Sequence, residues 1–298
     1  FLARHLPDQL TRAGTRLVGP VAATVSHDRR IVVARNLARA MGRPLGGVET
    51  RRLVGETFAW YARYYLESFE LPDLDAAAVD TGIEVDGFGP VERACASGVG
   101  PILVLPHLGT WEWAAWWLAQ VHGLKVTAVV EPLDPPEVFD WFVGLRESLG
   151  MNIVPLGPSA AAEVATAVKR GDVVCLLSDR DLAGGGVPVT FFGERTRLPA
   201  GPAFLALRTG APLMPTAVYW RGGSRHGLVL PAIDTERRGR FRDDVARVVQ
   251  DYAHALEQLI RAAPTQWHMM APNWPSDHRA LGRRVPESLR DLEVDTRH

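Results

Sequence analysis

Short apolar runs alternate with longer amphipathic stretches through the middle of the chain. The runs predict buried strands, at residues 102–105, 126–130, 153–154, 173–177, 187–192, 213–220 and 228–230. The stretches between them predict helices, at residues 111–121, 135–149, 160–170, 200–209 and 241–263. Strands and helices that alternate in this way indicate an α/β fold, with a central, mostly parallel or mixed sheet flanked by helices.

The amino-terminal part of the chain has helical periodicity instead. Breaks near Gly19-Pro20 and Gly42-Arg43-Pro44 divide the first 70 residues into three predicted helices. Aromatic side chains recur every three or four positions within residues 53–71, at Phe58, Tyr61, Tyr65 and Phe69. This spacing predicts a helix whose aromatic face packs against the core or, alternatively, lines a lipid groove.

The sequence shows no internal repeat and no linker long enough to separate two domains. We therefore expect a single domain over residues 1–298. Within it we distinguish a basic helical region at 1–52, a catalytic α/β body at 100–265 and a peripheral tail at 279–298.

The charges are balanced overall but unevenly distributed. The chain has 33 basic and 34 acidic residues, a balance that argues against nucleic acid as a partner. Residues 1–52 contain ten arginines and three acidic residues, whereas residues 53–92 contain one arginine and nine acidic residues. An apolar stripe from Leu2 to Leu17, flanked by Arg12 and Arg16, predicts a helix that lies on an anionic membrane surface. The alternative is a solvated helix docked on the protein itself.

The composition excludes further classes of protein. No apolar run reaches the roughly 18 residues of a membrane-spanning helix. Two cysteines, Cys95 and Cys175, are too few for a disulfide framework or a cysteine metal site.

The candidate chemistry follows the strand at 102–105. Pro106 ends that strand, His107 lies in the next loop, Thr110 is placed to cap a helix, and Glu112 falls in its first turn. Ligands of open α/β sheets bind beyond the carboxyl ends of the strands. His107 is therefore a candidate general base, and Glu112 a carboxylate that holds its second ring nitrogen. The alternative is a structural histidine beside a glutamate that the helix dipole favours.

At this point the sequence resembles a family. His107 and Glu112 match the H-x4-D/E signature of the glycerolipid acyltransferases, and the wider context resembles the lipid A late acyltransferases and, more closely, the phosphatidylinositol mannoside acyltransferases of actinobacteria. The matching segments are residues 106–112, 129–133, 146–150, 177–182, 191–194, 197–203 and Trp267-His268-Met269.

The resemblance implies a glycerolipid acyltransferase-like fold and an acyl-CoA-dependent O-acyltransferase. Its substrates would be acyl-CoA, or an acyl carrier protein, and a hydroxyl of a membrane glycolipid, such as the mannose of a phosphatidylinositol mannoside. His107 would deprotonate that hydroxyl, and Glu112 would orient the imidazole. Acyl-CoA would be a co-substrate, with neither a metal nor a cofactor required. The enzyme would be peripheral, on the cytoplasmic face of the plasma membrane.

Further site residues follow from the matched segments. Glu131 is assigned to the catalytic site, and substrate-binding roles are assigned to Gly109, Thr110, Arg146, Asp179 and Arg180. The mannoside branch has Glu-Arg-Asp where this chain has Asp179-Arg180-Asp181, and often Asp at the position of Glu112. The alternative is that Arg146, Asp179 and Arg180 form a structural ion-pair network.

Other functions remain open on the sequence alone. One alternative is a different lipid acceptor, as in a lipid A late acyltransferase, and another is an acyl-CoA thioesterase, in which water replaces the acceptor. The G-x-S-x-G nucleophile motif of serine esterases is absent from the sequence. A non-catalytic lipid carrier is disfavoured because His107 and Glu112 are both present.

Overall fold

The computed structural model describes residues 23–131, 135–181 and 184–293. The predicted apolar stripe from Leu2 to Leu17 and the predicted break at Gly19-Pro20 lie outside these ranges.

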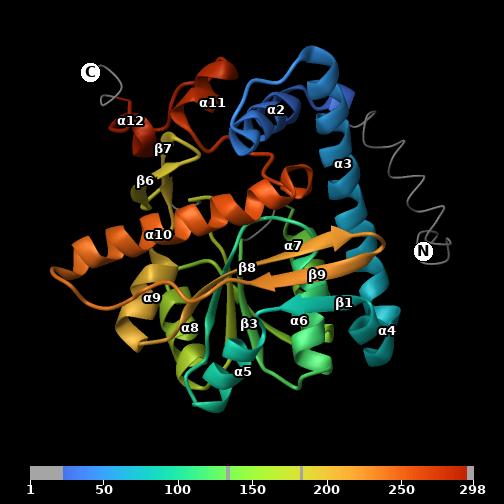
Figure 1. Ribbon diagram of the computed structural model, residues 1–298, viewed down its shortest axis with the longest axis vertical. Coiled ribbons are helices and arrows are strands. Elements are labelled where there is room, and N and C mark those ends of the chain that lie inside the picture. The colour runs from blue at the N-terminus through green and yellow to red at the C-terminus, as the bar shows by residue number, and fades with distance from the viewer. Residues whose placement is uncertain (1–22, 132–134, 182–183, 294–298) are drawn as a thin grey trace.

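The centre of the molecule is a seven-stranded sheet (Figure 1). The strands of the described residues are β1 (Ile83–Asp86), β2 (Ile102–Leu105), β3 (Val126–Val130), β4 (Met151–Pro155), β5 (Val173–Leu177), β6 (Val187–Phe191), β7 (Glu194–Leu198), β8 (Leu213–Arg221) and β9 (Ser224–Val229). The sheet order is β1-β9-β8-β2-β5-β3-β4. Strands β8, β2, β5, β3 and β4 are parallel, and β9 returns antiparallel to β8. The predicted α/β class with a mostly parallel sheet is confirmed.

Helices connect and cover these strands. In the described residues they are α2 (His27–Met41), α3 (Gly47–Glu70), η2 (Leu71–Asp73), α4 (Ala76–Thr81), α5 (Gly89–Ala96), α6 (Trp111–Gln120), α7 (Pro136–Ser148), α8 (Ala160–Lys169), α9 (Gly201–Thr209), α10 (Phe241–Ala262), η3 (Pro264–Gln266), α11 (Pro275–Ala280) and α12 (Glu287–Arg290). The helices predicted from residue 111 onward agree with α6 to α10 to within a residue or two at each end.

The elements that the sequence analysis missed are short or polar. Strand β7 has the sequence Glu-Arg-Thr-Arg-Leu and pairs only with β6, so it lacks the apolar run of a buried strand. Its Arg197 bonds the carbonyl oxygens of Gly186 and Ser288 at 2.8 and 2.6 Å. The hairpin thereby contacts the carboxyl-terminal segment, where Leu292 is buried within the predicted tail.

Strand β2 shows why the sheet has two covered faces. Ile102 and Val104 belong to a core cluster with residues of α8, α9 and α10, whereas Leu103 and Leu105 belong to a second cluster with residues of α5 and α6. Successive strand side chains point to opposite faces, so a strand that is buried on both must be apolar throughout. Figure 1 shows α10, α9 and α8 on one side of the sheet and α6 on the other.

The amino-terminal helices α2 and α3 pack on each other and on the rest of the fold. Val33 and Leu37 of α2 share a buried cluster with Leu53 and Phe58 of α3. On the opposite side of α2, Arg35, Arg39 and Asn36 reach the carboxyl-terminal segment: both arginines pair with buried Asp277, and Asn36 donates to the Met269 carbonyl at 2.8 Å. This arrangement places α3 beside the carboxyl ends of the central strands.

Candidate active site

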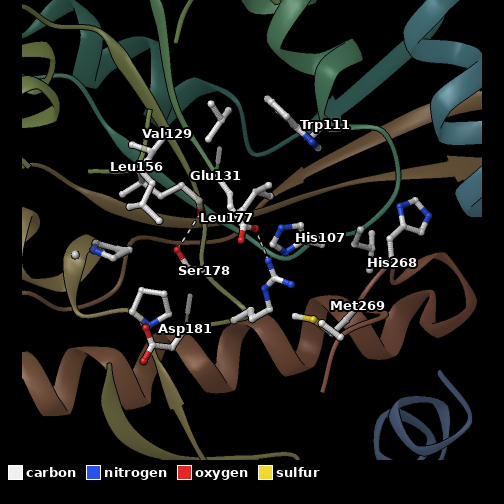
Figure 2. A pocket seen from close by; sticks show the side chains of 18 of the residues that line it. His107, Trp111, Val129, Glu131, Leu156, Leu177, Ser178, Asp181, His268 and Met269 are labelled. Carbon is white, nitrogen blue, oxygen red and sulfur yellow. Dashed lines mark hydrogen bonds and ion pairs between the residues drawn. The ribbon is translucent and has the colours of Figure 1, made fainter. Parts of the chain in front are cut away.

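A cavity of about 670 Å³ lies at the carboxyl ends of the parallel strands. The residue or loop after each of four strands contributes to its wall: His107 after β2, Glu131 after β3, Leu156 after β4 and Ser178 after β5. Figure 2 shows these four side chains around a common space. The location and size are those of a ligand site in an open α/β sheet.

His107 forms a dyad with Asp179, not with Glu112. The Nδ1 atom of His107 lies 2.5 Å from Oδ1 of Asp179, and the His107 amide donates to Oδ2 at 3.0 Å. Asp179 is 0% exposed. Asp179 was predicted to bind substrate, but its carboxylate accepts hydrogen bonds from other residues of the protein and does not line the cavity.

The register of the sheet accounts for this dyad. Strands β2 and β5 are adjacent and parallel, with Leu105 paired to Leu177. His107 and Asp179 each stand two residues beyond these paired positions, so the two loops bring them side by side. The single sequence contains both strands but not the fact that they are neighbours, because 72 residues separate the two side chains.

The electrostatics favour an ionised Asp179. Burial opposes ionisation, but the charge of His107 and the hydrogen bonds from His107 and Trp267 outweigh it and lower the pKa of the Asp179 carboxyl. An ionised carboxylate only accepts hydrogen bonds, so Nδ1 of His107 carries the proton of the dyad. The lone pair of the neutral imidazole is then on Nε2, the remaining ring nitrogen.

The structure does not place Glu112 against the His107 ring, where the sequence predicted it. Its carboxylate accepts hydrogen bonds from Tyr64 of α3 and, at 2.9 Å, from Arg146 of α7, and it is 1% exposed. The first turn of α6 therefore directs Glu112 toward α3 and α7, while the loop before it directs His107 toward β5. Glu112 thereby links α6 to α3 and α7 through hydrogen bonds. Its two partners, Arg146 and Tyr64, line the cavity.

Arg146, Asp179 and Arg180 do not form the single network considered as an alternative. Arg146 pairs with Glu112, and Arg180 pairs with Glu131 at 2.5 Å. Glu131 is exposed and Arg180 partly buried, and both line the cavity. The site thus contains three separate acid–base pairs, of which the Glu131–Arg180 pair is the most accessible to solvent.

Gly109 and Thr110 shape the loop through their backbone. Gly109 has a φ of +64°, and a Cβ atom there would lie 1.7 Å from the Val218 oxygen, so only glycine fits. Its amide donates to Gln266, and the amide of Thr110 donates to Val218. Thr110 precedes α6 but makes no side-chain cap, which differs from the prediction. Gly109 lines the cavity, and Thr110 is buried behind it.

The backbone amides of the loop between β2 and α6 donate hydrogen bonds within the protein. Those of His107, Leu108, Gly109 and Thr110 donate to Asp179, Pro106, Gln266 and Val218 respectively. None of these four amides is therefore available to stabilise an oxyanion. Arg180 is a cationic side chain that lines the cavity and is suited to supply such stabilisation.

His268 is a cavity residue to which the sequence analysis gave no role. Its amide donates to the His107 carbonyl at 2.7 Å, and its ring lies 5.5 Å from those of both Tyr61 and Tyr64. Burial, followed by the charge of His107, lowers the pKa of His268 to about 3, so its imidazole is neutral at physiological pH. The only signal in the sequence was its place in the matched segment Trp267-His268-Met269.

Within the described ranges, no three histidine, cysteine, aspartate or glutamate side chains are grouped so that they could hold a metal ion. Among the helices of the same residues, none combines the length and apolar character needed to cross a membrane.

Comparisons with known proteins agree with the resemblance seen in the sequence. A family model described as bacterial lipid A biosynthesis acyltransferase matches residues 1–276. A protein of Mycobacterium tuberculosis (strain ATCC 25618 / H37Rv), named phosphatidylinositol mannoside acyltransferase, is 39% identical over 248 residues, which cover 82% of this chain and 76% of the relative. A protein of Mycolicibacterium smegmatis with the same name is 39% identical over 246 residues, or 82% and 79% of the two chains.

The buried position of Glu112 generates a prediction about stability. Glu112→Gln leaves the Arg146 guanidinium without its countercharge, and we expect it to lower the free energy of unfolding by about 3 kcal/mol. Glu131→Gln is the matched control, since its ion pair is more exposed, and it should cost no more than about 1 kcal/mol. Urea denaturation measures both. Equal, small losses would contradict the structural role of Glu112.

Proposed function

The chain belongs to the bacterial lipid A biosynthesis acyltransferase family, and we propose that it transfers a fatty acyl group from acyl-CoA to a mannose hydroxyl of a phosphatidylinositol mannoside. Family membership makes it an acyltransferase, and the names of its relatives support a glycolipid acceptor. The observation that carries the proposal is the His107–Asp179 dyad beside a cavity with a long apolar wall.

In the proposed reaction His107 is the general base. Its Nε2 atom takes the proton of the acceptor hydroxyl as the hydroxyl oxygen attacks the thioester carbonyl. Asp179, bonded to Nδ1, holds the imidazole in the required tautomer and stabilises the imidazolium that forms. The tetrahedral intermediate then collapses, the carbon–sulfur bond breaks, and the coenzyme A thiolate takes the proton from His107.

We assign the stabilisation of the developing oxyanion to Arg180. The amides of the loop are already engaged, whereas the guanidinium of Arg180 lines the cavity and remains positively charged. Glu131 holds it there through the 2.5 Å ion pair. A fixed cation beside the reacting carbonyl contributes to the stability of the transition state.

The apolar wall is suited to the acyl chain. It consists of side chains from the sheet, from the loop after β4 and from α8 and α9, including Val129, Leu156, Val164, Leu176 and Leu205. Figure 2 shows Val129 and Leu156 on one side of His107 and His268 and Met269 on the other. We propose that the acyl chain lies along the first side, because burial of each methylene contributes about 0.8 kcal/mol.

The opposite side of the cavity is polar and suits the acceptor headgroup. Tyr61 and Tyr65 of α3, Arg29 of α2 and Arg146 of α7 line it, together with His268. The hydroxyl groups of Tyr61 and Tyr65 are 2.9 Å apart, so they form one hydrogen-bonding unit. Aromatic rings and hydroxyls of this kind are well suited to bind a sugar.

The enzyme is proposed to work as a peripheral protein on the cytoplasmic face of the plasma membrane. The excess of arginine in residues 1–52 supports attraction to anionic lipids. Part of this charge is engaged within the protein, since Arg35 and Arg39 pair with Asp277, and Arg43 pairs with Glu49. Arg12 and Arg16, which flank the predicted apolar stripe, are the proposed lipid contacts.

The first test measures acyl transfer directly. Thiol release from palmitoyl-CoA should rise when phosphatidylinositol mannoside is added, and an acylated lipid should appear by mass spectrometry. His107→Ala and Asp179→Asn should each lower kcat by about 10²- to 10⁴-fold, because the base is lost or misoriented. Arg180→Gln should lower kcat by about 10²-fold.

The same assay separates the alternatives. Release of free fatty acid without any response to the acceptor would indicate a thioesterase, and acylation of a lipid A precursor alone would indicate a different acceptor. Wild-type kcat in Asp179→Asn, with the fold intact by circular dichroism, would refute the dyad.

A second prediction concerns the acyl wall. Val164→Phe narrows the cavity from α8 and should displace the end of a long chain. We expect kcat/KM for palmitoyl-CoA to fall by about tenfold relative to octanoyl-CoA, the equivalent of about two methylene contacts. Thr166→Phe, on an exposed position of the same helix, is the control and should leave the ratio unchanged. An unchanged ratio in Val164→Phe would place the acyl chain elsewhere.

A third prediction concerns the membrane. The wild-type protein should cosediment with vesicles that contain anionic phosphatidylglycerol more than with neutral phosphatidylcholine vesicles. The double variant Arg12→Glu/Arg16→Glu should weaken this binding by at least about tenfold, since each arginine near the surface contributes about 1 kcal/mol. Arg242→Glu, at the start of α10, serves as the control. Equal binding of the wild type to both vesicles would exclude the electrostatic attraction.

A further inference from the structure

A short segment after α10 is aligned against the loop between β2 and α6, which contains His107. Leu108 and Trp267 form an antiparallel bridge, the His268 amide donates to the His107 carbonyl at 2.7 Å, and the Gly109 amide donates to the Gln266 carbonyl at 3.1 Å. Residues 266–268 therefore hold the backbone on both sides of Leu108. About 160 residues of chain separate the two segments, so the contact depends entirely on the fold.

The same segment is fixed to the central sheet. The side-chain amide of Gln266 bonds both backbone groups of Trp220 in β8: its oxygen accepts from the Trp220 amide at 2.8 Å, and its nitrogen donates to the Trp220 carbonyl at 2.9 Å. Gln266 is buried, so these bonds are shielded from water. The segment is thus a rigid support rather than a loose connection.

Trp267 extends from this support to the acid of the dyad. Its indole Nε1 donates to Oδ2 of Asp179 at 2.7 Å, and the ring is buried against Phe191 and Phe192. Asp179 is fully buried and receives three hydrogen bonds: His107 Nδ1 at Oδ1, and the His107 amide and Trp267 at Oδ2. Both carboxylate oxygens therefore have hydrogen-bond donors, and the carboxylate cannot rotate without losing a hydrogen bond.

We propose that Trp267 is a positioning residue for acyl transfer: its indole N–H fixes the Asp179 carboxylate so that Oδ1 faces Nδ1 of His107. This inference rests on the proposed function of the dyad. Trp267 does not line the cavity and so acts only through Asp179. Without the indole N–H, Oδ2 keeps a single donor, the His107 amide at 3.0 Å, and the carboxylate gains freedom to turn away from the imidazole.

The chain contains a matched control for this role. Trp274 is also buried, stacks on Phe191 with ring centroids 5.7 Å apart, and lies 6.5 Å from Trp267. In the part of the chain that the structure describes, its Nε1 atom has no hydrogen-bond partner. Loss of the indole N–H at 274 therefore removes no bond to an acceptor, whereas the same change at 267 removes the bond to Asp179.

The experiment replaces each tryptophan in turn with β-(3-benzothienyl)alanine, which has nearly the same shape but has sulfur in place of the N–H group. At position 267 we expect kcat for acyl transfer to fall by about tenfold to a hundredfold with KM unchanged, the usual effect of losing a group that orients a reacting side chain. At position 274 both constants should stay at the wild-type values.

Proton NMR gives a readout that does not require turnover. The short Nδ1–H bond of His107 should produce a low-field resonance, assigned by its disappearance in His107→Gln. This resonance should shift or broaden in the 267 replacement and remain unchanged in the 274 replacement.

The outcomes are distinct. An unchanged resonance and unchanged kcat at 267 would overturn the inference, as would equal losses at 267 and 274, which would indicate packing alone. If the wild type showed no transferase activity, the proposed function would fail, and the resonance would still decide whether Trp267 positions Asp179.

Discussion

The site depends on one contact, the bond between His107 and the buried carboxylate of Asp179. A buried carboxylate is costly unless it is paired and hydrogen-bonded, so its surroundings must supply donors at fixed positions. The parallel pairing of β2 with β5 brings the two side chains together, and the loop amide and Trp267 supply the remaining donors. The sheet register is thus the constraint from which the chemistry of this enzyme follows.

The three acid–base pairs around the cavity differ in burial, and their proposed roles differ accordingly. Glu112 and Arg146 are both largely buried and join α3, α6 and α7, which makes the pair a structural tie. Glu131 and Arg180 are more accessible and line the cavity, which suits a pair that meets substrate. The H-x4-D/E signature therefore combines His107, the proposed base, with Glu112, a residue that builds the wall beside it.

The amino-terminal helices contribute to the site as much as the sheet does. Tyr61, Tyr64 and Tyr65 of α3 all line the cavity, whereas Phe58 of the same helix is buried in the core. Helix α2 is held to the carboxyl-terminal segment by Arg35 and Arg39. Two segments from the ends of the chain thereby enclose the carboxyl edge of the sheet, and the polar side of the cavity lies between them and α7.

The sequence by itself determined most of the helices and strands of the body, because apolar runs and helical periodicity are set by residues that are close together in the chain. It also placed His107 beyond a strand and identified Glu131, Arg146 and Arg180 as cavity residues through the family resemblance. Only the tertiary structure decided which acid meets which base. Glu112 is near His107 in sequence, yet the geometry of the helix start turns it toward Arg146, while Asp179 reaches His107 through strand pairing. Such partners depend on strand order and register, which no local pattern of residues contains.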